Sequence, residues 1–91
     1  MTYSLRRDRD GAGDSGPMSL VAWQLEDGTI KYEHGARPRV GAIVLVGSLG
    51  GRSYAAQDYW ATTPVTEILE DTEFRMRFKT GNSVYTWEIL Q

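Results

Sequence analysis

The sequence contains no cysteine, three prolines and a single histidine among its 91 residues. Without cysteine there can be neither disulfides nor a thiolate metal site, so apolar packing has to stabilise the fold. No apolar run approaches the roughly 18 residues that a membrane-spanning helix needs, and the N-terminus lacks the apolar centre of a signal peptide. We therefore expect a cytoplasmic protein that makes no contact with a membrane.

An excess of positive charge is also missing. Ten Lys and Arg residues face twelve Asp and Glu residues, for a formal net charge of −2. A domain that binds duplex nucleic acid usually carries a basic excess, and this one does not. The chain is not acidic enough to imitate a nucleic-acid backbone either, so its charge points to no particular partner.

The chain is long enough for one domain. Residues 1–17 mix charges of both signs with Gly, Asp and Ser, and their few apolar residues predict a disordered tail. The apolar pattern starts directly after Met18. We therefore expect a tail over 1–17 and a folded domain over 18–91.

Period-two alternation predicts strands through most of that domain. The strongest hairpin signal is Asp27-Gly28 between the runs 19–26 and 29–34, because Gly tolerates the positive φ of a tight turn. Residues 40–46 (VGAIVLV) predict a strand buried on both faces, and residues 65–69 predict a further strand after Pro64.

The C-terminal residues predict a hairpin with a defined register. A two-residue Gly81-Asn82 turn places Arg75 opposite Glu88, a favourable cross-strand pair. A three-residue loop would send an apolar face to solvent, so we expect the two-residue turn. In this register three inward-facing pairs form: Phe74 with Ile89, Met76 with Trp87, and Phe78 with Tyr85.

About five strands with short turns and one long loop predict a mainly β fold, a small SH3-like or OB-like five-stranded antiparallel barrel with the disordered N-terminal tail. A twisted antiparallel sheet with one helical turn packed on it is the alternative.

No motif in the sequence predicts catalysis, a cofactor or a metal ion. The glycine cluster at 47–51 lacks the Gly-Lys-Ser/Thr of a phosphate-binding loop, and His34 has no positioned partner. The carboxylates of Glu67, Glu70, Asp71 and Glu73 do not follow a calcium-loop pattern. Arg75, Arg77 and Lys79 are expected to form a solvated strand face, with contact to phosphates as the alternative. We therefore expect a protein that is not an enzyme.

The loop over residues 52–63 is the best candidate site, because Tyr, Trp and Arg dominate binding hot spots and also stack on bases. The alternative is that its aromatic residues plug the end of the barrel. The candidate binding residues are Arg52, Ser53, Tyr54, Gln57, Asp58, Tyr59, Trp60, Thr62 and Thr63.

Four stretches of the chain resemble small uncharacterised bacteriophage or prophage proteins. They are Arg39-Val40-Gly41, Arg52-Ser53-Tyr54 with Gln57-Asp58-Tyr59-Trp60, residues 62–69 (TTPVTEIL) and residues 78–87 (FKTGNSVYTW). The resemblance covers residues 39–90 and implies a phage accessory role, such as blocking a host protein or sequestering a nucleotide signal of a defence system. It supplies no catalytic residues.

These observations predict a non-catalytic module that binds a protein partner through the loop 52–63. The alternative is a protein that binds a nucleotide or nucleic acid, with the same loop stacking on bases and Arg52 reaching a phosphate. The sequence leaves a homo-oligomer open.

Overall fold

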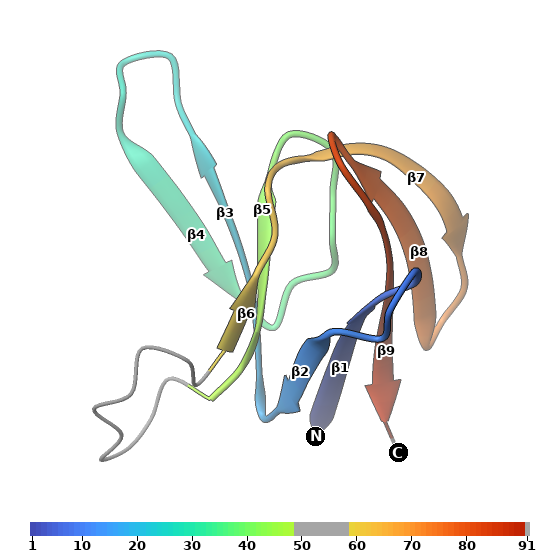
Figure 1. Ribbon diagram of the computed structural model, residues 1–91. Helices are drawn as coiled ribbons and strands as arrows, with labels where there is room; N and C mark the ends of the chain where they lie inside the picture. Colours follow the sequence, from blue (N-terminus) through green and yellow to red (C-terminus); the bar gives the residue numbers. More distant parts are fainter. Residues whose placement is uncertain (49–58, 91) are drawn as a thin grey trace.

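Figure 1 shows a computed structural model of the protein, which describes residues 1–48 and 59–90. The fold is mainly β, as expected, and none of the described residues lies in a helix. One antiparallel sheet has the strand order β2-β1-β9-β8-β7 and the other β4-β3-β5-β6. The strands are β1 (Thr2–Arg7), β2 (Gly13–Gly16), β3 (Met18–Gln24), β4 (Ile30–His34), β5 (Ile43–Gly47), β6 (Tyr59–Ala61), β7 (Val65–Asp71), β8 (Arg75–Thr80) and β9 (Val84–Leu90).

The N-terminal segment differs from the sequence prediction. Residues 1–17, expected to be a disordered tail, form β1 and β2 and belong to the same folded unit as the rest. β1 pairs with β2 on one side and with β9 on the other, and Leu5 is completely buried. The prediction counted apolar residues only, whereas backbone pairing on both sides of β1 satisfies its polar groups and needs little apolar content.

The C-terminal hairpin has the predicted register. Phe78 lies opposite Tyr85, Met76 opposite Trp87, and Arg75 opposite Glu88. The Thr80 amide donates to the Ser83 carbonyl at 2.8 Å, which closes a two-residue turn. Four of the six predicted inward side chains are buried and Ile89 packs against the core, but Phe74 is 46% exposed because it precedes β8.

The first predicted hairpin is also present, as β3 and β4. Gly28 has a φ of +90°. The Leu25 amide donates to the Thr29 carbonyl at 2.8 Å, so the turn between these two residues contains three residues. β5 begins at Ile43, three residues later than expected. Val44 and Val46 are buried in the core, whereas Ile43 and Leu45 on the opposite face are only partly buried.

The chain crosses from one sheet to the other at Pro17, between β2 and β3. Here the two sheets approach so closely that a Cβ added to Gly16 would lie 2.4 Å from the Gly47 carbonyl oxygen. At the centre of the core, the Trp87 indole of one sheet donates to the Ser19 hydroxyl of the other at 2.9 Å. The structure therefore differs from the predicted five-stranded barrel, since the described residues form nine strands in two sheets and no closed barrel.

The connection from β4 to β5 covers one opening between the sheets (Figure 1). Ala36 packs against the core, and the Arg37 guanidinium lies 5.2 Å from the centre of the Trp87 ring. Arg37 also donates to Asp71 at 2.7 Å and to the carbonyls of Thr72 and Glu73. Arg37 thus joins the β4–β5 connection to the turn between β7 and β8 through these hydrogen bonds.

Candidate functional site

The predicted site falls partly outside the described residues. Arg52, Ser53, Tyr54, Gln57 and Asp58 lie there, so their predicted role in binding stays a prediction. The remaining candidates are described: Tyr59 and Trp60 belong to β6, and Thr62 and Thr63 follow it.

Trp60 is half-buried and packs against the core from β6. Its indole nitrogen donates to the Tyr85 hydroxyl at 3.3 Å. The Arg7 guanidinium lies 5.2 Å from the centre of the ring, at cation–π distance. These contacts give Trp60 a packing role, which is the alternative that the sequence left open for the aromatic residues of the loop.

Thr62 is 7% exposed, and its side chain forms hydrogen bonds with backbone groups. Its hydroxyl accepts a hydrogen bond from the Val44 amide at 3.1 Å and donates one to the Thr63 carbonyl at 2.7 Å. Its own amide donates to the Val44 carbonyl at 2.9 Å. Thr62 therefore continues the pairing of β5 beyond the end of β6, while the Thr63 side chain is exposed.

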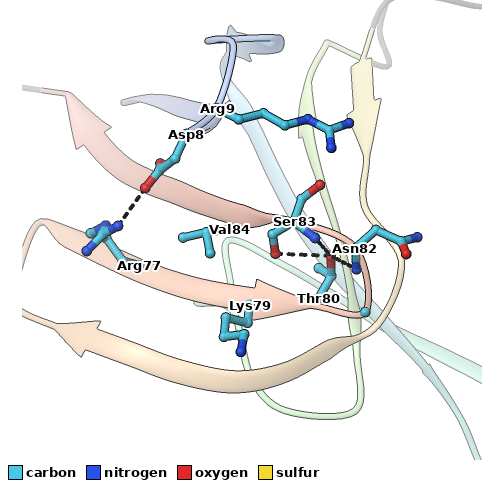
Figure 2. A pocket seen from close by; sticks show the side chains of 9 residues that line it. Asp8, Arg9, Arg77, Lys79, Thr80, Asn82, Ser83 and Val84 are labelled. Atoms are coloured by element: carbon cyan, nitrogen blue, oxygen red, sulfur yellow. Dashed lines mark hydrogen bonds and ion pairs between the residues drawn. The ribbon is translucent and has the colours of Figure 1, made fainter.

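A hollow lined mainly by charged and polar residues lies beside the turn between β8 and β9 (Figure 2). Two of the charged residues there belong to an ordered network, in which Asp8 accepts from Arg77 at 2.6 Å and from the Thr86 hydroxyl at 2.7 Å. Burial raises the pKa of Asp8, but these hydrogen bonds outweigh burial and hold the pKa below its ordinary value. The hollow is lined by Asp8, Arg9, Arg77, Lys79, Thr80, Gly81, Asn82, Ser83 and Val84.

A second hollow shares Arg9, Thr80, Asn82 and Ser83 with the first and extends towards Arg7 and Trp60. Arg7 makes two hydrogen bonds to Asp10, at 3.0 and 2.8 Å. Because Asp8 and Asp10 are each paired with an arginine, Arg9 and Lys79 are the cations here that have no ion-pair partner among the described residues. The two hollows together thus carry an excess of positive charge.

The outer face of the β4-β3-β5-β6 sheet carries apolar side chains that point away from the other sheet. Val21 and Val44 point into the core, so alternation directs their neighbours outward, away from the other sheet. Ile30 is 57% exposed and Tyr32 64% exposed on this face, whereas Leu20 is buried, at 8% exposed, and Ile43 and Leu45 are partly buried. The apolar members of this outer face are Leu20, Ala22, Ile30, Tyr32, Ile43, Leu45 and Ala61.

The described residues contain no group of three or more His, Asp or Glu side chains that could hold a metal ion. His34 is exposed at the end of β4, where its ring meets Tyr32 edge-on at a centroid distance of 6.0 Å. Residues 1–48 and 59–90 include no helix with the length and hydropathy that a membrane span requires.

The sequence indicates the basic stripe that includes Arg77 and Lys79, but it predicts neither surface as a whole. The cations Arg7 and Arg9 stand in the segment predicted to be a disordered tail. No sequence pattern therefore indicates that they line a hollow together with Trp60 and Ser83. The outer face could have been found from the alternation of Ile30 and Tyr32 with Lys31 and Glu33.

Comparisons with protein-family models, with curated proteins and with solved structures found no match to this chain. The phage resemblance and the cytoplasmic location therefore stay predictions.

Proposed function

We propose that this protein is a non-catalytic protein-binding domain that docks its partner on the outer face of the β4-β3-β5-β6 sheet. The observation that carries the proposal is the exposed apolar side of a sheet whose other side already packs on the core. In soluble proteins, contiguous exposed apolar patches usually serve interaction.

The composition of the outer face supports this proposal. Tyr32 offers a large rigid ring with a polar tip, the type of side chain that dominates protein interfaces. Ala22 on β3 lies beside Tyr32, and Ile43 and Leu45 on β5 continue the apolar surface beyond β3. A shallow hollow on the same face, lined in part by Ala22, Ile30, Ile43 and Pro64, offers a place for an apolar side chain of the partner.

The experiment uses a photo-crosslinking amino acid at Leu45 in the full chain, with the same amino acid at exposed Thr66 on β7 as the matched control. The expected result is one protein of the natural host cross-linked from position 45 and not from position 66. The purified partner should then bind the wild-type chain, and Ile43→Glu should weaken binding by about 2 kcal/mol or more, the range of a hot spot. If position 45 yields no more product than position 66, the proposal fails.

The polar hollows favour a second function, the binding of a nucleotide phosphate. Arg9 and Lys79 supply charge, and Asn82 and Ser83 supply hydrogen-bonding groups within the same shallow site. Because Arg7 already covers the Trp60 ring, the described residues suit a phosphate better than a stacked base.

This second function is tested by thermal shift with nucleoside triphosphates and with inorganic phosphate. The double variant Arg9→Ala/Lys79→Ala should abolish the rise in melting temperature that a ligand produces by mass action. Arg6→Ala is the control, because Arg6 is exposed and donates to Ser15. An equal shift in both variants would rule out the hollow as the site.

A further inference from the structure

β4 is an edge strand that the rest of the described chain leaves uncovered. It ends the four-stranded sheet, and all five of its side chains are exposed. Figure 1 shows the β3–β4 hairpin leaning away from the five-stranded sheet. Such an edge offers a row of unpaired backbone groups on which another strand can pair.

The hydrogen bonds of the hairpin determine which backbone groups point to the free edge. The Leu25 amide donates to Thr29, and the Gly35 amide donates to Ser19. In an antiparallel pair, hydrogen-bonded and non-hydrogen-bonded positions alternate, so Lys31 and Glu33 also bond to β3. The amides and carbonyls of the residues between them, Ile30, Tyr32 and His34, therefore point outward.

We propose that β4 pairs with β4 of a second copy of this chain, antiparallel, about a two-fold axis at Tyr32. In this register Tyr32 faces its equivalent, and Ile30 of each chain faces His34 of the other. All three outward-facing residues of one strand then meet outward-facing residues of the other. Because each such pair exchanges two hydrogen bonds, the interface contains six.

Charge complementarity favours this occupant over other strands. The axis at Tyr32 places Lys31 of each chain opposite Glu33 of the other, at the non-hydrogen-bonded positions where side chains come closest. Two opposite-charge pairs form, and such pairs stabilise a sheet. Moving the axis by one residue would place Lys31 or Glu33 opposite itself, so the charges select a single symmetric register.

The result is a continuous eight-stranded sheet formed by two copies of the four-stranded one. The apolar outer face continues across the junction, because Ile30 and Tyr32 stand on the same face in both chains. The dimer interface uses the backbone groups at the edge of β4, whereas the proposed partner docks on side chains of the outer face of the sheet, so the two can fail separately. Ile43→Glu should weaken partner binding and leave the dimer intact.

The test is sedimentation equilibrium of the full chain and of charge variants. The wild type should be a dimer at high concentration. Lys31→Glu alone and Glu33→Lys alone should each raise the dimer dissociation constant by about 10- to 100-fold, because both cross-strand pairs become repulsive. An equimolar mixture of the two variants should restore association, since every pair in that heterodimer again joins opposite charges.

Tyr32→Pro gives an independent test of the backbone pairing. Among the backbone hydrogen-bonding groups, proline removes only the outward-facing amide hydrogen of Tyr32, which is not bonded to β3, and such edge positions tolerate proline. A Tyr32→Pro chain with an unchanged circular dichroism spectrum should be a monomer. A wild type that stays monomeric up to about 1 mM, or single charge variants that associate as well as their mixture, would overturn the proposal.

Discussion

A few buried polar contacts at single residues join the two sheets. Ser19 is 1% exposed; its hydroxyl accepts from the Trp87 indole and donates to the Ala36 carbonyl at 3.3 Å. It therefore connects a strand of each sheet and the segment that closes one opening between them. Among the described side chains, no buried polar atom lacks a hydrogen-bond partner.

Ser19→Ala should cost about 1–3 kcal/mol, because it leaves the indole N–H of Trp87 buried without an acceptor. Urea denaturation of the purified chain measures the loss. The control is Ser15→Ala, whose hydroxyl accepts only an exposed hydrogen bond from Arg6 and should change stability by less than about 0.5 kcal/mol. Equal costs for the two variants would show that the Ser19–Trp87 contact adds nothing to stability.

Acid should weaken the fold through Asp10. The hydrogen bond from Arg7 above all, with one from the Ala12 amide, lowers the pKa of Asp10 from 3.8 to about 2. The unfolded chain binds this proton more tightly, so the stabilisation is present above about pH 4 and is lost as pH falls towards 2. The difference in denaturation midpoint between the wild type and Asp10→Asn should shrink as the pH falls from 5 to 2. A difference that does not depend on pH would contradict this linkage.

Among the elements, β1 contributes most that the sequence did not reveal. It lies between β2 and β9, buries Leu5 in the core and leads into the Asp8 contacts to Arg77 and Thr86. Its removal would expose one edge of β9 and the surface around Trp87.

Deletion of residues 1–17 should therefore destabilise the domain severely, where a disordered tail could be removed without effect. The loss of Leu5 alone corresponds to about 2–5 kcal/mol, the range for emptying a buried leucine site. A thermal melt of the chain starting at Met18 measures the effect, with Leu5→Ala as the milder variant. If the truncated chain melted at the wild-type temperature, β1 would have no structural role.

The two hairpins that the sequence predicted correctly contain their own local signals. Asp27-Gly28 defines the turn between β3 and β4, and the alternation on both sides of Gly81-Asn82 defines the register of β8 and β9. β1 could not be predicted in this way, because its pairing with β9, some eighty residues away, leaves no local pattern. The candidate site was limited in the same way. The residue types of the loop 52–63 point to Trp60, but its contacts with Arg7 and Tyr85 join residues that are distant in sequence.

For the whole molecule, the close approach of Gly16 and Gly47 sets the distance between the two sheets at Pro17. Any side chain at Gly16 would push against backbone atoms, which cannot move without separating β2 from β5.

Gly16→Ala should destabilise the domain by about 1–3 kcal/mol, as expected when a tightly packed position is overfilled. Gly81→Ala is the control, because an added Cβ there meets no atom within 4 Å and its φ is not positive. That control should be neutral or slightly stabilising. Chemical denaturation of both variants measures the difference in stability. If Gly16→Ala were as stable as Gly81→Ala, the two sheets would be able to move apart at this point without loss of stability.

Each of the three tryptophans has an arginine guanidinium over its ring: Arg39 for Trp23, Arg37 for Trp87 and Arg7 for Trp60. The charge beside each indole affects the energy of its excited state, so the fluorescence of this protein contains three local reporters. Trp87 reports on the centre of the core, Trp23 on the segment after β4, and Trp60 on the meeting point of β6 with the N-terminal strand. Chains that keep a single tryptophan could therefore show, by emission alone, which of these regions loosens first.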